Sequence, residues 1–376
     1  MALLNVIVAY CGLLIILSWL LPEGWQVRAI LIGTVIFLAW QAPVSLLLLG
    51  LSTLISYWIF QLPISAGLAA VIVVVQNVAL LVLYKLGFAQ EVLSPGDRMM
   101  PLGLSYYSFR QIHYALEKYK AKLDRHDFLD YAAYLFFLPT ILLGPIHRFQ
   151  PFLRSIYRRR WDQRLFSEGL ERILYGYAKI VIIGNFLITN LLARLSMALE
   201  EQFLWLSTYT RVLVYTLNTY FQFAGFSDVA IGLALLLGFR VMENFNAPFR
   251  APNLNEFWNR WHISLSSWCK DYVYTTTASI TRKPILGILL TMVVIGLWHE
   301  ISWRYLLWGA VHGIGIAIWH LYNRRPIPAR MVGGPRVMYA LSVGITFHYV
   351  LFSFILIKEK NWEAVGETLS ILVGLS

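Results

Sequence analysis

Apolar runs that approach the width of a lipid bilayer recur along this chain of 376 residues. A helix needs about 20 apolar residues to cross the hydrocarbon core, and the run from Ala2 to Leu21 has that character. Hydrophobic residues make up 58% of the chain and charged residues only 14%, which is more apolar material than a soluble domain could cover. The runs are continuous and not alternating, so they favour helices over the strands of a membrane barrel. We therefore predict an all-α, polytopic transmembrane protein with about ten or eleven spans and additional re-entrant or interfacial helices.

The first apolar run is interpreted as a retained span, because no basic segment precedes it and no small-residue cleavage site follows it. Two other stretches, 51–62 and 103–116, are apolar but short or interrupted, and we expect re-entrant or interfacial segments there. The expected spans are 2–21, 28–50, 66–88, 128–146, 171–192, 206–223, 226–239, 285–299, 304–322 and 337–357.

The net charge of +11 comes from 31 lysines and arginines against 20 acidic residues. Basic loops that stay in the cytosol beside anionic lipid explain this excess, so we expect no nucleic-acid partner. Two basic patches, within 118–126 and 147–164, flank the single apolar stretch 128–146. If both patches are cytosolic, that stretch cannot cross the membrane once. Pro139 and Pro145 fit a broken helix there, which must be surrounded by protein or by a water-filled cavity.

Two histidines are the leading candidates for chemistry. His299 ends an apolar run, and an ionisable residue at membrane depth is a functional candidate by default. His262 lies in the segment 255–272, whose helical spacing places Asn259 and Ser266 on the same polar face. Histidine is the side chain best suited to moving a proton near neutral pH. The competing interpretations are a carbonyl-bonded structural residue for His299 and an interfacial residue for His262.

Three further residues are candidates to line a substrate cavity. Asp228 closes the stretch 225–228, which we interpret as a turn-like break between two apolar runs. A carboxylate at membrane depth needs a partner, so Asp228 is either structural or cavity-lining. Trp298 and Glu300 flank His299 and are included with it.

Other chemistries are less well supported. Catalytic zinc needs three protein ligands, and His312 could serve as a third only through the fold, so we expect no metal. A G-x-S-x-G elbow of serine hydrolases is missing from the sequence. Lys270 would favour a Cys269 thiolate, but a single cysteine on an aromatic helix is expected to be packed. A proton-coupled transporter would use the histidines as relays, yet the related halves typical of transporters are not seen.

Seven blocks resemble the membrane-bound O-acyltransferase family, in the bacterial branch that includes the alginate O-acetylation protein and the D-alanyl transfer protein of teichoic acid. The blocks cover roughly residues 80–322, and the two that contain His262 and His299 are specific when taken together. They are Pro101–Phe109, Leu143–Ile146, Phe223–Gly232, Asn244–Phe249, Glu256–Ser266, Gly296–His299 and Leu307–Gly313.

The resemblance implies a ring of helices around a central cavity, with an acyl thioester on the cytosolic side and an acceptor hydroxyl in an outward-facing cavity. It makes His299 the catalytic residue and His262 the second active-site histidine. Glu300 stands where the bacterial branch commonly has glycine. It further implies one membrane-embedded acyltransferase domain over 1–376, composed of N-terminal helices (1–95), a catalytic core (96–325) and a C-terminal helix (326–376).

We therefore expect a multi-pass O-acyltransferase of the bacterial inner membrane. A histidine general base, His299, would activate a hydroxyl of a cell-envelope or exported polysaccharide, and His262 or Asn259 could stabilise the oxyanion. The acyl group is expected to be acetyl and not aminoacyl, with D-alanyl or another carrier-borne group as the alternative.

No bound cofactor is expected, because the donor, acetyl-CoA or an acyl-carrier thioester, is a substrate. The expected partners are the lipid bilayer, coenzyme A or a small acidic carrier protein, and the glycan acceptor, reached directly or through a periplasmic partner acyltransferase. An acidic donor would dock on a cytosolic basic surface, formed by Arg154, Arg158, Arg159 and Arg160.

Overall fold

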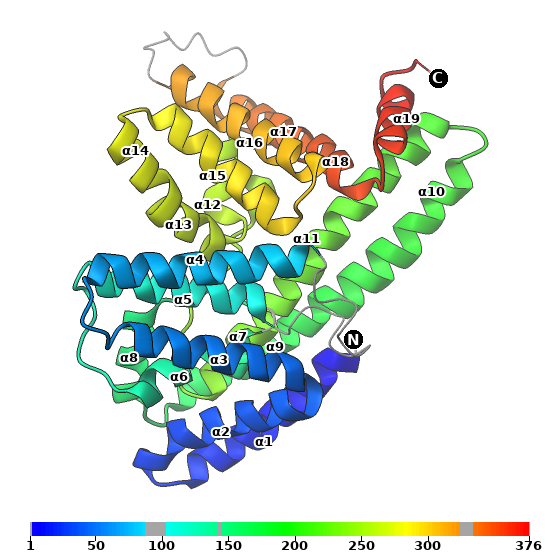
Figure 1. Ribbon diagram of the computed structural model, residues 1–376. Coiled ribbons are helices and arrows are strands. Elements are labelled where there is room, and N and C mark those ends of the chain that lie inside the picture. Colours follow the sequence, from blue (N-terminus) through cyan, green and yellow to red (C-terminus); the bar gives the residue numbers. More distant parts are fainter. Residues whose placement is uncertain (1, 87–102, 142–143, 324–333, 376) are drawn as a thin grey trace. The chain divides into compact units, whose positions relative to one another are not determined.

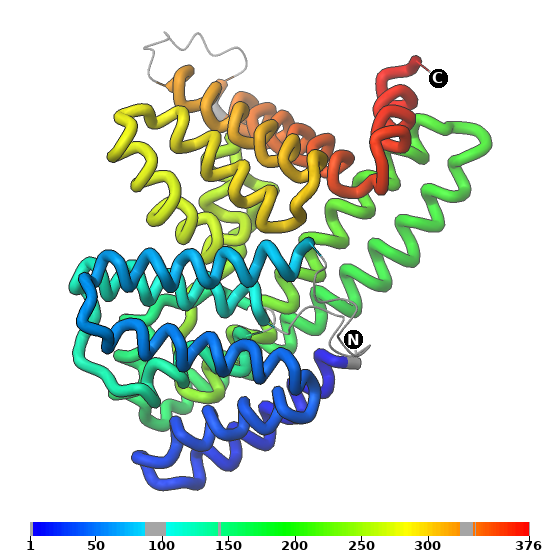
Figure 2. The backbone as a smooth tube through the Cα atoms, viewed as in Figure 1, coloured from blue at the N-terminus to red at the C-terminus, as the bar shows by residue number. Residues whose placement is uncertain are grey.

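The computed structural model describes residues 2–86, 103–141, 144–323 and 334–375, and these residues form helices with no strand among them (Figure 1 and Figure 2). The chain divides into two compact units. The first comprises Met1–Tyr175 and Phe226–Met242, and the second comprises Gly176–Gly225 and Glu243–Ser376. Pro101, Leu102 and Leu143 of the sequence blocks lie outside the described residues. The all-α prediction is confirmed.

The sequence predicted the bounds of the first helices of the first unit only in part. Pro43 starts a new helix, because proline is favoured in a first turn and disrupts a helix interior. The prediction of one span over 28–50 is therefore wrong, and the stretch 51–62 mostly belongs to this new helix. The helices are α1 (Ala2–Leu20), α2 (Glu23–Gln41), α3 (Pro43–Ile59), α4 (Ala66–Lys85), α5 (Leu104–Tyr119), α6 (Phe128–Leu135), α7 (Leu138–Ile141), α8 (Phe149–Tyr157) and α9 (Gln163–Tyr177).

The predicted break within 128–146 is confirmed by the separation of α6 from α7. Pro139 has no N–H, and its ring would clash with the carbonyl of Leu135 in a continuous helix. The fully buried Arg110 donates to the carbonyls of Leu135 (3.0 Å) and Thr140, which the broken helix leaves available. Buried carbonyls need such partners, so one side chain from α5 stabilises the break.

The predicted turn at 225–228 is wrong, since α11 (Leu204–Leu236) runs through it. The polar residue is accommodated without a turn because Asp228 forms an ion pair with Arg172 of α9 (3.4 Å). Close packing supports the same pair of helices in the first unit. A Cβ on Gly232 would lie 2.6 Å from the carbonyl oxygen of Gly169, so only glycine allows this approach.

The second unit carries both candidate histidines. Its α15 (Pro284–His299) and α16 (Trp303–Tyr322) form a close antiparallel hairpin, in which a Cβ on Gly309 would meet the backbone of Met292. The remaining elements are the π-helical η1 (Ala178–Leu192), α10 (Ala193–Leu199), the 3-10 helix η2 (Pro248–Arg250), α12 (Leu254–Arg260), α13 (Ile263–Cys269), the π-helical η3 (Lys270–Tyr274), α14 (Thr275–Thr281), α17 (Gly334–Ser353), α18 (Ile355–Lys358) and α19 (Trp362–Leu372).

Several helices have the length and character of membrane spans. Along α1, Leu13, Ile16 and Leu17 are each more than half exposed, as expected of side chains that contact lipid. Within the described residues, five helical segments are long and apolar enough to cross a bilayer: Leu3–Leu20, Ala66–Lys85, Gln163–Leu199, Leu204–Leu236 and Arg336–Lys358. Five such segments are the number expected of a protein that crosses the bilayer several times.

Candidate active site

A break in the chain positions His262. The sequence predicted one helix over 255–272, but α12 ends at Arg260 and α13 starts at Ile263. His262 between them has φ 44° and ψ 52°, a left-handed conformation that is unfavourable for a residue with a side chain. The backbone N–H of Ile263 donates to the carbonyl of Asn244 (2.9 Å), and this contact helps to hold the strained residue. Such strain is typical of functional sites.

The hydrogen bonds of His262 define its tautomer. Its Nδ1 lies 3.0 Å from Oδ1 of Asn244, which also accepts from the backbone N–H (3.3 Å) and the hydroxyl (2.8 Å) of Ser264. A backbone N–H can only donate, so the shared atom is the amide oxygen, and Nδ1 of His262 must carry the proton. The lone pair of neutral His262 is therefore on Nε2. That atom is buried and has no hydrogen-bond partner among the described residues.

The surroundings of His262 keep the ring neutral. The residue is only 1% exposed and lies outside the candidate membrane spans. Burial, and secondly the charge of nearby His299, hold the pKa of His262 well below its ordinary value of 6.5. Near neutral pH the ring therefore presents a free lone pair, which can accept a hydrogen bond or a proton.

Trp298 links the two candidate histidines. Its ring centroid lies 4.6 Å from that of His299 and 6.0 Å from that of His262. His299 is the last residue of α15 and is exposed, whereas His262 is buried. Glu300 forms an ion pair with Arg304 (3.5 Å). The structure therefore gathers His262, Trp298 and His299 at one end of the α15–α16 hairpin.

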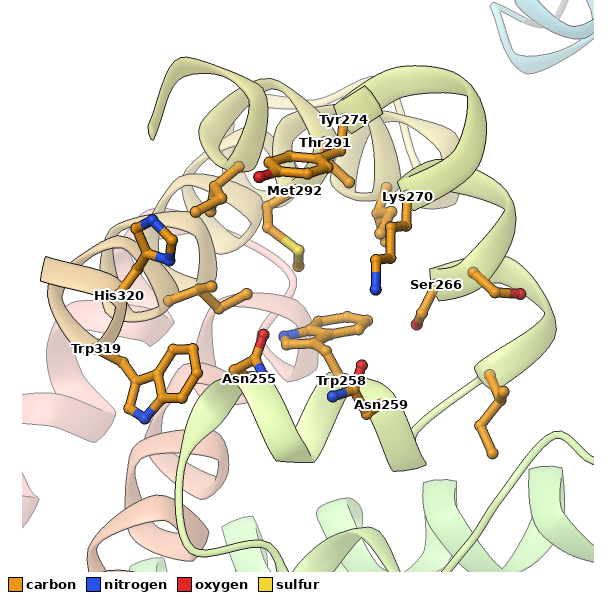
Figure 3. Close-up of a pocket in the computed structure, with 15 residues that line it drawn as sticks. Asn255, Trp258, Asn259, Ser266, Lys270, Tyr274, Thr291, Met292, Trp319 and His320 are labelled. Carbon is orange, nitrogen blue, oxygen red and sulfur yellow. The ribbon is translucent and has the colours of Figure 1, made fainter. Parts of the chain in front are cut away.

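A cavity of about 350 Å³ lies in the second unit (Figure 3). The predicted cavity residues Asn259 and Ser266 both line it. His262 and His299 are not among its lining residues, but Ile263 follows His262 in the chain, and Ile295 precedes His299 by about one helical turn. The lining residues are Asn255, Trp258, Asn259, Ile263, Ser266, Ser267, Lys270, Tyr274, Ile288, Thr291, Met292, Ile295, Ile316, Trp319 and His320.

His312 has a positioning role that the sequence did not reveal. Its Nδ1 accepts from the indole N–H of Trp258 (3.3 Å), and its Nε2 contacts the hydroxyl of Ser353 (2.9 Å). The Ser353 hydroxyl donates in turn to the carbonyl of Val350 (2.7 Å), so Nε2 of His312 is the donor in the contact with Ser353. Nδ1 of His312 thus holds the indole of Trp258, a wall of the cavity, while Nε2 anchors the ring to Ser353. Within the described part of the chain, no group of three or more His, Cys, Asp or Glu side chains is placed to hold a metal.

The structure places the remaining candidates in the first unit. Asp228 is paired with Arg172, as described above. Arg154, Arg158 and Arg160 are exposed, as docking would require. Arg159 is not: it donates to the carbonyl of Leu237 (2.7 Å) and the hydroxyl of Ser18 (2.9 Å), and it stacks on the ring of Trp19. The predicted docking surface must therefore be corrected by removing Arg159.

Several residues of the site could not be identified from local sequence. Asn244 lies 18 residues before His262, so no short spacing connects them. In the sequence, Lys270 stands out only as the neighbour of Cys269, and that cysteine is fully buried. His320 lies outside the seven family-like blocks, yet it lines the cavity with Lys270.

Comparison with known proteins identifies the family. The sequence model of the membrane-bound O-acyltransferase family matches residues 24–357. The chain is 32% identical to the "Probable alginate O-acetylase AlgI" of Pseudomonas aeruginosa, over 92% of this chain and 69% of that protein. It is 26% identical to the peptidoglycan O-acetyltransferase of Helicobacter pylori (74% and 58% covered) and 28% identical to the teichoic acid D-alanyltransferase of Bacillus subtilis (72% and 71% covered). The chain belongs to the membrane-bound O-acyltransferase family and is an O-acyltransferase.

Proposed function

We propose that this enzyme transfers an acetyl group from a cytosolic thioester to a hydroxyl of a cell-envelope or exported polysaccharide. The observation that carries the proposal is the pairing of His262, with its free Nε2 lone pair, and His299 around Trp298. Relatives named for alginate and peptidoglycan acetylation support this acceptor class. We place the enzyme in the bacterial inner membrane. The donor is coenzyme A or a small carrier protein, and the glycan is reached directly or through a periplasmic partner.

The proposed reaction needs only proton transfer and positioning. His299 takes the proton of the acceptor hydroxyl while the oxygen attacks the thioester carbonyl carbon. The carbon–sulfur bond then breaks, and the leaving thiolate takes the proton back from His299. Neutral His262 has no proton on Nε2 and cannot stabilise the oxyanion as a donor there. The single proton of the reacting hydroxyl goes to His299, so Nε2 of His262 is left to accept a hydrogen bond from a neighbouring hydroxyl of the glycan and to align the acceptor. The donor to the oxyanion is then a group such as Asn259.

D-alanyl transfer is the second candidate function. It is favoured by the relative named as a teichoic acid D-alanyltransferase, of which the chain covers 71%. The same histidine chemistry would serve, because only the acyl group and its carrier differ. Membership of an acyltransferase family sets aside the transporter interpretation.

Mass analysis of envelope and exported glycans tests the proposal. Cells without the gene should lose one kind of ester, and wild-type protein should restore it while His299→Ala should not. Loss of acetyl esters supports the first function, and loss of D-alanyl esters supports the second. Identical glycans in both strains, with the protein expressed in its native host, would overturn the proposal.

A further inference from the structure

A second cavity, of about 340 Å³, lies in the first unit and is lined by residues of α2, α6 and α8 and by residues next to them. Helix α6 packs against both α2 and α8. The lining carries charges of both signs: the carboxylates belong to Glu23, Asp127 and Asp130, and the guanidiniums belong to Arg28 and Arg159. None of these five side chains forms an ion pair with another described residue. Opposite charges therefore share one cavity without neutralising one another.

The carboxylates of this cavity keep acceptor positions free. Asp130 accepts from the hydroxyl of Tyr157 (2.8 Å), and Asp127 accepts from the backbone N–H of Asp130 (2.8 Å). A carboxylate has about four lone-pair positions, so these bonds leave acceptors unused. Glu23 is exposed and has no hydrogen-bond or ion-pair partner within the described residues. The carboxylates can therefore accept further hydrogen bonds from a cationic donor.

The two guanidiniums differ in what they can bind. Arg159 is buried and donates to the carbonyl of Leu237 (2.7 Å), so its role is to support the wall of the cavity. Arg28 is exposed and lies over the ring of Trp25 at 5.2 Å, a contact that contributes only about 0.5–1 kcal/mol at an exposed site. Its five N–H donors form no hydrogen bond with the described part of the chain. Arg28 is therefore the cation that can bind an anionic group.

The side chains along α2 place the cavity at the boundary of the membrane. Trp25 is 56% exposed, and tryptophan is enriched where the hydrocarbon core meets the headgroups. Val27 and Leu31 line the cavity and continue it along the helix. Ile32 and Ile36, one to two turns further on, are each more than half exposed, as expected of side chains that contact lipid. The polar part of the cavity therefore opens beside an apolar surface that acyl chains can cover.

The flanking charges indicate which leaflet this end faces. Lys122 and Arg125 are exposed just before α6, and Arg158 and Arg160 are exposed just after α8. The positive-inside bias places such residues in the cytosol. The carboxylates of the cavity are thus an acidic site within a basic surface, and they oppose the binding of a headgroup that is only anionic.

We propose that this cavity binds a phospholipid of the cytosolic leaflet whose headgroup carries a primary ammonium beside its phosphate. Glu23 and Asp127 accept N–H bonds from the ammonium, and Arg28 binds the phosphate, as a guanidinium is suited to do. A trimethylammonium headgroup has no N–H to donate and is typically recognised by an aromatic cage instead. The inference goes beyond the proposed function and does not depend on it, because His262 and His299 belong to the other unit.

Native mass spectrometry of the purified full-length protein tests the ammonium contact. The micelles contain equal amounts of phosphatidylethanolamine, phosphatidylcholine and phosphatidylglycerol with the same acyl chains. The wild-type protein should retain phosphatidylethanolamine about tenfold in preference to the other two lipids. Glu23→Gln and Asp127→Asn should each remove most of that preference. Both changes remove one charge and preserve the fold, because Glu23 has no partner to lose and asparagine is as good a helix cap as aspartate.

Asp124→Asn is the matched control for the acidic variants. Asp124 is exposed three residues before Asp127 and does not line the cavity, so this variant should keep the wild-type preference. Arg28→Gln should behave differently from the acidic variants. It should weaken the binding of all three lipids by a similar factor, because they share the phosphate, and Arg125→Gln at an exposed position outside the cavity should not.

Each result has one meaning. The inference is overturned if both acidic variants keep the preference, or if Asp124→Asn loses it to the same extent, since surface charge alone would then explain the binding. Equal retention of phosphatidylcholine would show that the ammonium N–H groups are not recognised. Displacement of the lipid by an equal concentration of glycerophosphoethanolamine, which has the same headgroup and no acyl chains, would identify a soluble phosphoester as the ligand and overturn the assignment to a membrane lipid.

Discussion

At the scale of single residues, the site depends on a contact that fixes one proton. Asn244 accepts from Nδ1 of His262 and is itself held by two bonds from Ser264. Hydrogen-bond partners of this kind fix the tautomer and the orientation of a histidine ring. The left-handed backbone at His262 brings the ring into this contact. The strain is therefore coupled to the contact that fixes the tautomer of His262.

Replacing His299 by alanine should lower acyl transfer by a factor on the order of 10²–10⁴, because the proposed general base is removed. The protein should still insert and fold. Activity of purified protein, normalised to the folded fraction, is the measurement. His348→Ala is a suitable control, since His348 is exposed and does not line the cavity. Near-normal turnover of the His299 variant would refute its assignment as the base.

Replacing Asn244 should change the pH at which turnover is lost in acid. In the wild-type protein the pKa of His262 is lowered, so His262 stays neutral below pH 6.5 and its own protonation should reduce kcat only below that value. Asn244→Asp places a carboxylate on Nδ1, which favours the charged ring and raises the pKa of His262. The loss of kcat that protonation of His262 causes should then move to higher pH. Asn246→Asp adds the same charge at an exposed neighbour and should not move it.

The same lowered pKa affects stability. Because the unfolded state binds a proton at His262 more readily, the stability that neutral His262 contributes is complete above about pH 6.5 and is lost as the pH falls below it.

Identical pH–rate profiles for the wild-type protein and Asn244→Asp would show that His262 does not titrate during turnover.

At the scale of elements, the packing of helices decides where a helix continues and where it ends. The polar stretch 225–228 was predicted to form a turn. It instead lies within α11, because Arg172 neutralises Asp228 and the helix continues. The regular spacing over 255–272 was predicted to be one helix, yet it divides at His262. Both differences arise from contacts with other elements, which override local periodicity.

A matched pair of glycine variants tests the packing of α9 against α11. Gly232→Ala places a Cβ against the carbonyl oxygen of Gly169, so the helices must separate at a cost of about 1–3 kcal/mol. Gly50→Ala meets nothing within 4 Å and should leave the thermal midpoint unchanged or raise it slightly. Thermal unfolding in detergent is the measurement. Equal midpoints for the two variants would show that the close approach does not contribute to stability.

At the scale of the whole molecule, charge should govern the encounter with the donor. Arg154, Arg158 and Arg160 are exposed in the first unit, whereas Arg159 is buried and engaged. Changing two of the exposed arginines to glutamate should raise KM for an acidic donor more than it lowers kcat, since such charges mainly speed association. The difference from the wild-type protein should shrink at high salt. Labelling of cysteines introduced there from the periplasm of intact cells would contradict a cytosolic docking surface.

The sequence by itself determined the membrane class and the family, and it singled out two candidate histidines. Span length and motif are local properties, so apolar runs and the blocks around His262 and His299 could be recognised without a fold. Only the tertiary structure decided the tautomer of His262, the burial of Arg159, the continuity of α11 and which residues line the cavity. Each of these depends on partners far apart in the chain, and no local pattern specifies such contacts.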